Sequence, residues 1–245
     1  MRAAIFSDIH SNPFALRAVL KDIERQKPEL ILCAGDVFGY YPWAQEVFEL
    51  LLPLGAKTVL GNHDRLVLET LGLVSQKTGG QRPSYYEAAR LNGLELSSEA
   101  REWLKHLPAS LAVEAGSWRI RMVHGTPENL LEGRYYPDDT SQPAWMPSTK
   151  EILVLGHTHY PILRRTHGGG WLLNPGSVGQ PRDGLPQPGW IALELTDAGD
   201  AQAELHRVAY DQFEPMTVLT AMNWPEKFIR ALNKTNSGPL PSATV

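Results

Sequence analysis

The chain is almost without cysteine: Cys33 is the only one in 245 residues. A disulfide network within the chain is therefore excluded, and the fold must depend on an apolar core, for which this length suffices. Cys33 lies in the apolar run LILCA (30–34), which predicts a small buried side chain. The alternative, a catalytic thiol, lacks a neighbouring histidine in the sequence.

Long apolar runs are absent as well. No stretch approaches the ~18 consecutive apolar residues that a membrane-spanning helix needs. The opening MRAAIFSDIH turns polar after six residues, which is too soon for the apolar region of a signal peptide. We therefore expect a cytoplasmic enzyme or binding protein with no membrane partner.

Positive charge is not in excess either. Lys and Arg together number 23 against 27 Asp and Glu, which gives a net charge of −4. Without a broad basic surface, binding to extended nucleic acid is not expected, and a polynucleotide nuclease is disfavoured. Any affinity for phosphate must come from a metal or from a few well-placed cations.

The first part of the chain alternates strand and helix patterns. Buried strands are predicted over 3–6, 30–35 and 57–61, and helices are predicted to begin at Pro13 and Pro42. Such alternation implies crossover connections and a largely parallel sheet.

The pattern then changes twice. Residues 64–106 read as helical without intervening strands, and Pro108 ends that region. Short strands follow at 110–115, 118–125, 151–156, 161–165, 171–176, 190–195 and 203–210. This order predicts two sheets packed face to face with helices outside. We expect one domain over 1–235 with a helical insertion at about 65–107, and a disordered tail at 236–245.

A long connection without regular structure is predicted at 126–150, a segment rich in proline and tyrosine. Connections of this length are often functional. Its aromatic residues Tyr135, Tyr136 and Trp145 could stack on a nucleobase. Alternatively, they pin the segment to the body of the protein or form a subunit contact. The sequence leaves open whether the chain forms a homo-oligomer.

Polar side chains stand where the predicted strands end. They are Asp8 and His10, then Asp36, then Asn62, His63 and Asp64, then His124, then His157 and His159. The carboxyl ends of strands in an α/β sheet lie along one edge, where ligands bind, so we expect these residues to converge.

The chemistry of this set points to metals. Oxygen ligands mixed with imidazole and without thiolate suit Mn²⁺, Fe, Zn²⁺ or Co²⁺ better than Ca²⁺ or a structural zinc. The candidates are too many for one ion. Two metals about 3.5–4 Å apart, bridged by a carboxylate, would accommodate them.

Each residue alone also has an ordinary explanation. His124 could be a loop histidine, Asp8 a helix cap, and Asp36 and Asn62 turn residues. However, five of the eight histidines follow directly after apolar strands, most of them beside an acid or amide. That concentration favours one shared site.

The motifs resemble the calcineurin-like metallophosphoesterase superfamily. The matching blocks are SDIH (7–10), GD (35–36), GNHD (61–64), HG (124–125) and GHTH (156–159), in the family's order, with NPGSVGQPR (174–182) similar to its bacterial phosphodiesterase-like branch. This resemblance implies a four-layer α/β/β/α sandwich of two mixed sheets flanked by helices. Ser11 stands where many relatives have glycine.

The resemblance also implies a role for each block. Asp8, His10 and His159 would bind a first metal, Asn62, His124 and His157 a second, and Asp36 would bridge both. His63 would face the substrate as general acid, with Asp64 orienting its ring and raising its pKa. The two ions are expected to be Mn²⁺, with Fe, Zn²⁺, Co²⁺ and Ni²⁺ left open.

The implied activity is hydrolysis of a phosphodiester in a small, nucleotide-type substrate by attack of a metal-bound hydroxide. A phosphomonoesterase or protein phosphatase is the alternative. The segment GDVFGYYP (35–42) lacks the Asp-Arg-Gly motif of the protein phosphatases, and Asp64 stands where they have Glu. Both differences argue against the protein-phosphatase branch. A non-catalytic metal-binding scaffold is disfavoured by the complete ligand set. Arg65 and Arg182 are candidate phosphate contacts, or else surface arginines.

Overall fold

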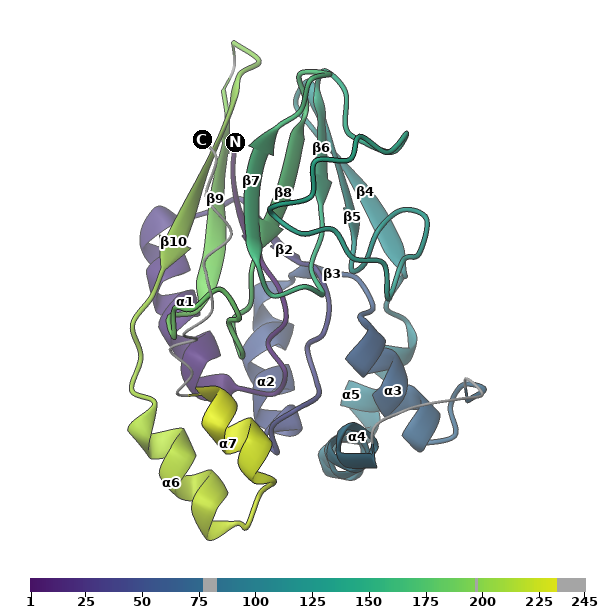
Figure 1. Cartoon of the computed structure of the whole chain (residues 1–245), viewed down its shortest axis with the longest axis vertical. Coiled ribbons are helices and arrows are strands. Elements are labelled where there is room, and N and C mark those ends of the chain that lie inside the picture. Colours follow the sequence, from purple (N-terminus) through teal and green to yellow (C-terminus); the bar gives the residue numbers. More distant parts are fainter. Residues whose placement is uncertain (77–82, 197, 233–245) are drawn as a thin grey trace.

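The computed structural model describes residues 1–76, 83–196 and 198–232. Two five-stranded mixed sheets pack against each other, and helices cover the outer face of the first sheet (Figure 1). This confirms the predicted mixed α/β architecture. The expected disordered tail at 236–245 lies outside the described residues.

The first sheet contains the βαβ units of the N-terminal part. β1, β2 and β3 run parallel, β9 pairs antiparallel with β1, and β10 pairs antiparallel with β9 at the edge. The order is β10 (Ala201–Arg207), β9 (Gly189–Leu195), β1 (Arg2–Phe6), β2 (Leu30–Cys33) and β3 (Lys57–Thr58).

The second sheet is built from the later strands. β5, β6 and β8 run parallel, and the hairpin partners β4 and β7 lie antiparallel at the two edges. The order is β4 (Ser110–Ala115), β5 (Trp118–Val123), β6 (Glu151–Val154), β8 (Trp171–Pro175) and β7 (Pro161–Arg165).

The alternation of side chains along β1 explains how the layers are held together. Ile5 packs into the core between the sheets together with Ile120 and Leu173 of the second sheet. Its neighbours Ala4 and Phe6 point to the other face, toward the helices. Because successive side chains of a strand alternate between faces, a strand that is apolar throughout is buried on both sides.

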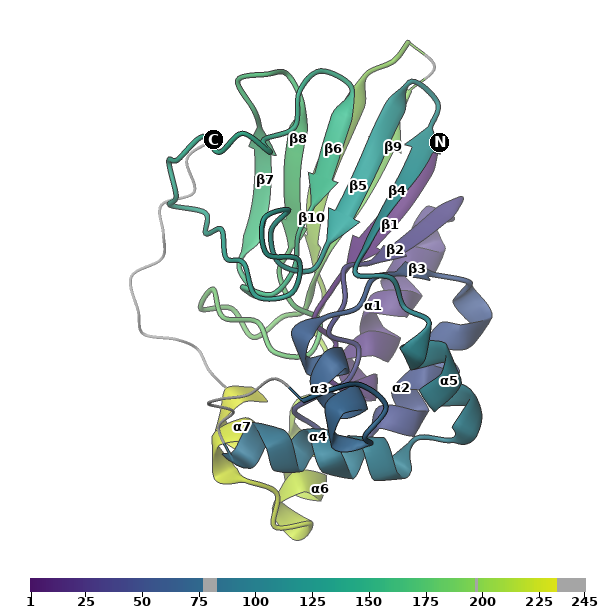
Figure 2. The same ribbon diagram turned by 90° about the vertical axis from the view of Figure 1, so that its right-hand side faces the viewer.

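Two helices cover the outer face of the first sheet. They are α1 (Pro13–Gln26) and α2 (Ala44–Leu51), whose ribbons are drawn in Figure 2. Their apolar stripes join the core with Phe6. The Asn12 side chain caps α1 by accepting from the backbone N–H of Ala15 at 3.1 Å, and Pro13 occupies the first turn. Cys33 is buried on this face, where burial raises the pKa of its thiol. The prediction of a small buried side chain is confirmed.

Helices α3 (Asn62–Thr70), α4 (Pro83–Glu95) and α5 (Ser98–Lys105) fall in the region predicted to be a helical insertion. Two further helices, α6 (Phe213–Ala221) and α7 (Glu226–Leu232), were not predicted. Both are short, and β-branched residues such as Thr217 and Val218 weaken the helix propensity of α6. No helix in the described ranges is long and apolar enough to cross a membrane.

The outer face of the second sheet is covered by part of the 126–150 segment. Tyr135, 2% exposed, packs there with Leu153 and Leu172, and Trp145 lies against the same cluster. The Tyr135 hydroxyl accepts a hydrogen bond from Arg164 Nη1 at 2.7 Å. These two aromatics therefore pin the segment to the sheet and do not form a nucleobase wall.

Candidate active site

The polar residues that follow the strands lie together at one edge of the two sheets. Asp8 and His10 follow β1, Asp36 follows β2, and Asn62 begins α3 just after β3. The second sheet contributes His124 after β5, and His157 and His159 after β6. All of these side chains are buried except Asn62 and His157, which are half-buried. The structure thus brings together every predicted metal ligand.

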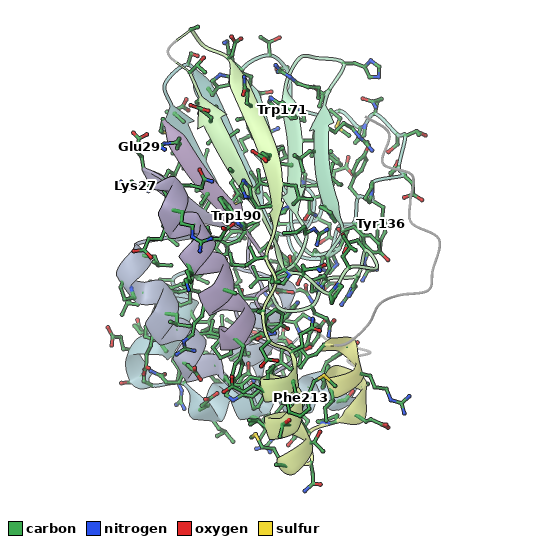
Figure 3. The ribbon with its side chains drawn as sticks, turned by 90° about the vertical axis from the view of Figure 1, so that its left-hand side faces the viewer. Lys27, Glu29, Tyr136, Trp171, Trp190 and Phe213 are labelled. Atoms are coloured by element: carbon green, nitrogen blue, oxygen red, sulfur yellow. The ribbon has the colours of Figure 1, made fainter. Side chains whose placement is uncertain are left out.

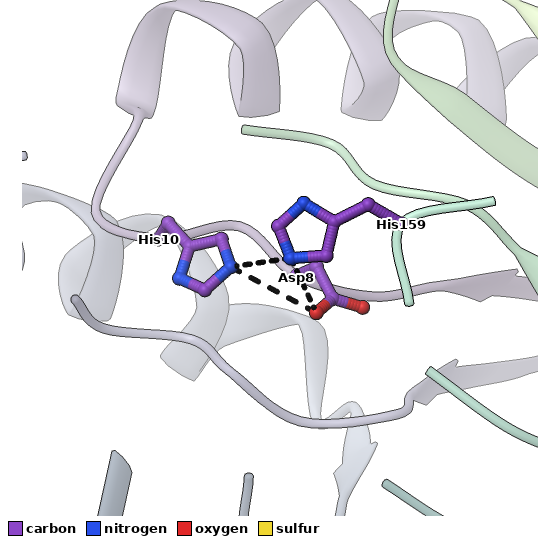
Figure 4. A group of neighbouring side chains, drawn as sticks. All are labelled: Asp8, His10 and His159. Atoms are coloured by element: carbon purple, nitrogen blue, oxygen red, sulfur yellow. Dashed lines mark hydrogen bonds and ion pairs between the residues drawn. The ribbon is translucent and has the colours of Figure 1, made fainter. Parts of the chain in front are cut away.

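The first group consists of Asp8, His10 and His159, whose candidate ligand atoms lie within 4.8 Å of one another (Figure 4). Nε2 of His159 is 3.2 Å from Oδ1 of Asp8. Nε2 of His10 is 3.0 Å from Nε2 of His159 and 3.8 Å from the same Asp8 oxygen. Oδ1 of Asp8 and the Nε2 atoms of His10 and His159 are thus directed toward one another, as ligands of a single ion would be.

The second group gathers around Asn62. Its Oδ1 is 3.0 Å from Nε2 of His124 and 2.8 Å from Nδ1 of His157. Asp36, His124 and His157 again have ligand atoms within 4.8 Å of one another.

Asp36 lies between the two groups. Its Oδ2 is 3.8 Å from Nε2 of His10 and 3.3 Å from Nε2 of His124. Its other oxygen, Oδ1, accepts from the backbone N–H of His63 at 2.8 Å, which fixes the orientation of the carboxylate. One carboxylate oxygen therefore faces both groups, as a bridging ligand would.

Backbone carbonyls orient two of the imidazoles. Nδ1 of His124 is 2.8 Å from the carbonyl of Ala34, and Nδ1 of His159 is 2.6 Å from that of Gln180. A carbonyl can only accept, so each Nδ1 carries the hydrogen and the neutral ring directs the Nε2 lone pair into the site. Such partners are typical of histidines that bind metals.

The ligand atoms of the site need a cation or a proton among them. Nε2 of neutral His124 faces two acceptor oxygens, those of Asn62 and Asp36. Oδ1 of Asp8 is buried and has no hydrogen-bond partner among the described residues. Facing lone pairs repel each other unless a cation or a proton lies between them, so these residues fit divalent metal ions.

The electrostatics of the site agree with this fit. Burial raises the pKa of Asp36, but the facing imidazoles of His124 and His63 outweigh burial and hold this pKa well below its usual range. Burial lowers the pKa of His124, but Asp36 and Asp8 outweigh it and raise this pKa to about 9. A proton on His124 thus compensates negative charge that a metal would otherwise neutralise.

The backbone around the ligands is in an unusual conformation. Asp8, His10, Asp36, His157 and His159 have φ between 51° and 65°, in the left-handed region. Such positions cost about 1–3 kcal/mol each outside glycine and cluster at functional sites. The following Ser11 is also left-handed, with φ of 58°, which fits the preference of relatives for glycine there.

Asp64 does not have the role predicted from the resemblance. Its carboxylate accepts from the backbone N–H groups of Gly61 at 3.0 Å and Phe38 at 2.9 Å, and no bond to the His63 ring is present among the described residues. Asp64 is in the first turn of α3, so its side chain turns back to cap the helix. The expected rise in the pKa of His63 is also wrong, because burial lowers it to about 4.

His63 does lie at the cavity wall. Its ring stands edge-on to His10, at 5.0 Å between ring centroids, and to Tyr40 at 4.6 Å. The cavity has a volume of about 340 Å³ and opens onto Asp36, Asn62, His157 and His159. The remaining wall is formed by Tyr40, Tyr85, Tyr136, Arg134 and Arg182.

The two predicted arginines have different positions. Arg182 lines the cavity, and its Nη2 donates to the Tyr40 hydroxyl at 2.9 Å. Arg65 does not line it: its Nε donates to Glu69 Oε1 at 2.9 Å, one turn further along α3. This ion pair directs the Arg65 side chain along the helix, as in the alternative of a surface arginine.

Arg134 was not predicted as a site residue. It is exposed and lines the same cavity as His157, whose pKa is lowered to about 4 by burial first, then by the charge of His124, and least by that of Arg134. The only sequence signal for it was its position in the long 126–150 segment. Tyr136, in the same segment, is 39% exposed and also reaches the cavity.

The chain is similar to known proteins over most of its length. It is 30% identical over 227 residues to an uncharacterized protein of Methanocaldococcus jannaschii, covering 85% of this chain and 87% of the other. A crystal structure of a metallophosphoesterase from Sphaerobacter thermophilus is 27% identical with a TM-score of 0.76, over 96% of this chain and 99% of that one.

A hypothetical protein from Pyrococcus horikoshii OT3 shares the fold, with 24% identity and a TM-score of 0.80 over 97% of this chain and 99% of that one. The family model described as "Calcineurin-like phosphoesterase superfamily domain" matches residues 1–198. This match agrees with the buried carboxylate and histidine groups at the sheet edge. The protein therefore belongs to the calcineurin-like phosphoesterase superfamily, and it is a metal-dependent hydrolase of phosphoric esters.

Proposed function

We propose that the protein hydrolyses a phosphodiester bond in a small, nucleotide-type substrate with the help of two divalent ions. The position of Asp36 carries this proposal. Its Oδ2 faces His10 of the first ligand group at 3.8 Å and His124 of the second at 3.3 Å. A carboxylate shared in this way is the usual bridge of a two-metal site.

Asp8, His10 and His159 would hold one ion, and Asn62, His124 and His157 the other. Oxygen and imidazole donors without thiolate favour Mn²⁺, and Fe, Zn²⁺, Co²⁺ and Ni²⁺ suit the same donors. When bound, the pair supplies an acidified water and positive charge against the phosphoryl oxygens.

His63 is the proposed general acid. Its ring lines the cavity, and its backbone N–H is anchored on Asp36, so its position is fixed relative to both ligand groups. Burial keeps the ring neutral near pH 7 in the free protein. A bound phosphate brings negative charge beside the ring and favours its protonated form.

Arg182 and Arg134 are the proposed phosphate contacts. Arg182 lies near the first group, because it donates to the hydroxyl of Tyr40, whose ring stacks on His10. Its charge also helps to lower the pKa of His159, after burial. Arg134 lies near His157 of the second group. Cations on both sides of the metal centre suit a substrate with anionic groups on either side of the scissile bond. A cavity of about 340 Å³ suits a small molecule.

The test uses metal-stripped protein, with and without added Mn²⁺, supplied with bis-p-nitrophenyl phosphate or p-nitrophenyl phosphate. We expect turnover that depends on Mn²⁺ and favours the diester. Preference for the monoester would indicate a phosphomonoesterase instead. A protein that holds two ions but turns over neither compound would contradict the proposal and favour the scaffold alternative.

A further inference from the structure

His10 differs from His124 and His159, the other two buried histidines among the candidate metal ligands. Nδ1 of His124 and Nδ1 of His159 are each held by a backbone carbonyl, but Nδ1 of His10 is buried and has no hydrogen-bond partner among the described residues. The orientation of the His10 ring must therefore come from packing. A metal ligand whose ring is free to turn would bind its ion weakly.

Tyr40 provides that packing. Its ring is stacked on His10 with 4.0 Å between centroids and 23° between planes. The side chain is 4% exposed, so its own position is fixed by neighbours. Gly39, the residue before Tyr40, lies so close to Nδ1 of His10 that an added Cβ would be 2.8 Å away. The His10 ring thus packs against both the Tyr40 ring and the backbone of Gly39.

The hydroxyl of Tyr40 contacts a second residue of the site, Arg182. It accepts a hydrogen bond from Nη2 of Arg182 at 2.9 Å, and Gln180 Oε1 accepts from the same nitrogen at 3.3 Å. Arg182 lines the cavity, so one tyrosine contacts both a metal ligand and a proposed phosphate contact. Any shift of Tyr40 would affect both.

Tyr40 is in turn held by helix α7 and the residues before it. Phe228, 2% exposed, stacks on the Tyr40 ring with 5.3 Å between centroids and 23° between planes. Trp224 Nε1 donates to the Tyr40 carbonyl at 2.9 Å. The Tyr41 hydroxyl donates to the Phe228 carbonyl at 3.3 Å. The ring of Tyr40 and its neighbour Tyr41 are therefore tied to α7, and its backbone is tied to Trp224 just before α7.

Both α6 and α7 lie beyond residue 198, where the match to the family domain ends. In Figure 1 they form the yellow end of the described chain, on the side of the helices. We propose that α7 is part of the active site: Phe228 and Trp224 position Tyr40, and Tyr40 positions His10 for metal binding and Arg182 for phosphate binding. This inference rests on the proposed metal site.

Two kinds of variant separate this role from general support of the fold. Phe228→Leu removes the ring that is stacked on Tyr40. Tyr40 then holds the His10 ring less firmly, and Mn²⁺ affinity should fall by about tenfold. Tyr40→Phe keeps the stack and removes only the hydroxyl. It should leave Mn²⁺ affinity unchanged and raise KM for bis-p-nitrophenyl phosphate by about tenfold, because Arg182 loses a partner.

Phe213→Ala is the matched control. Phe213 begins α6, the partner helix of α7, and is 77% exposed (Figure 3), so its removal should change neither quantity. Mn²⁺ affinity is measured by calorimetric titration of the metal-stripped full chain, and KM on the metal-loaded enzyme. Circular dichroism melting identifies any variant that does not fold.

The outcomes distinguish failure of the inference about α7 from failure of the proposed function. If Phe228→Leu folds and binds Mn²⁺ as tightly as the wild type, α7 does not position the ligand and the inference is overturned. If Phe228→Leu does not fold, Tyr40→Phe decides: an unchanged KM overturns the inference, and a raised KM with unchanged Mn²⁺ affinity supports it. Wild-type protein that binds no divalent ion would instead overturn the proposed function, and the inference with it.

Discussion

At the scale of single residues, the two oxygens of Asp36 have different partners in the site. Oδ2 faces His10 and His124, and Oδ1 accepts from the backbone of His63. This carboxylate is 1% exposed, so few other partners can stabilise its charge. The metal centre therefore depends on it more than on any one imidazole.

Asp36→Asn should weaken the binding of both ions. The amide keeps the size of the side chain but removes the charge that we propose to bridge two cations. We expect Mn²⁺ affinity to fall by about 100-fold or more and metal-dependent turnover to be lost. Metal content after dialysis and calorimetric titration measure this. Glu114→Gln, at a side chain that is 76% exposed, is the control. Two ions retained in Asp36→Asn would exclude the bridging role.

His63→Ala should separate metal binding from catalysis. The side chain is proposed to give a proton to the leaving group and not to bind metal. The variant should keep both ions and lose about 10²–10⁴ in rate, least for substrates with good leaving groups. Turnover across a series of aryl phosphodiesters, with metal content measured in parallel, tests this. Loss of metal in this variant would mean that His63 is a ligand.

The raised pKa of His124 gives a prediction about protons. In the ion-free protein this pKa is about 9, so at pH 8 the ring is mostly protonated, and it must lose that proton to bind a metal. Mn²⁺ binding at pH 8 should therefore release about one proton from this residue, and the release should disappear well above pH 9. Calorimetry in buffers of different ionisation enthalpy measures it. A release that does not depend on pH would contradict the prediction.

At the scale of elements, helix α4 ties the ligand loops together. Asn92 is fully buried, and its Oδ1 accepts from Ser11 Oγ at 2.6 Å and from the Gly39 backbone N–H at 2.9 Å. Its Nδ2 donates to the Tyr41 carbonyl at 2.8 Å. One side chain from the helical region thus fixes the loop after β1 and the loop after β2.

Asn92→Ala should destabilise the protein by about 2–4 kcal/mol, because it leaves buried donors and an acceptor without partners. Denaturant unfolding of the metal-stripped protein measures the change in the free energy of unfolding. Leu94→Ala on the same helix, at a side chain that is 60% exposed, should stay within about 0.5 kcal/mol of the wild type. Equal effects of the two substitutions would show that the Asn92 bonds do not matter.

At the scale of the whole molecule, the metal centre joins the two sheets. Asp8, His10, Asp36 and Asn62 follow strands of the first sheet, and His124, His157 and His159 follow strands of the second. Ions bound by both sets link the two halves of the sandwich. Bound metal should therefore contribute to the stability of the whole fold.

Saturating Mn²⁺ should raise the melting temperature of the stripped protein. At 100 times Kd the expected gain is about 2.7 kcal/mol per site, which corresponds to roughly 5–10 °C for a chain of this size. Calorimetric scans with and without Mn²⁺ measure the shift. The Asp36→Asn variant should show little of it, and an equal shift in that variant would indicate ions bound elsewhere.

The candidate ligands could be predicted because they follow buried strands. The apolar runs before Asp8, Asp36 and His124 predict strands, and the carboxyl ends of strands converge in an α/β fold. The order of strands in the second sheet and the short helices α6 and α7 could not be predicted. Their positions depend on contacts with distant residues, since weak local patterns do not specify which faces meet.

The sequence by itself determined the strands, the helices of the βαβ units and the ligand set, because these follow from local periodicity and from the chemistry of the residues at strand ends. The tertiary structure alone decided what surrounds the ligands. It directs Asp64 to the backbone, Arg65 to Glu69, and Arg134 to the cavity. It also brings Trp224 to Tyr40 across 184 residues of chain. Contacts of this kind depend on how the layers pack, and no local pattern encodes them.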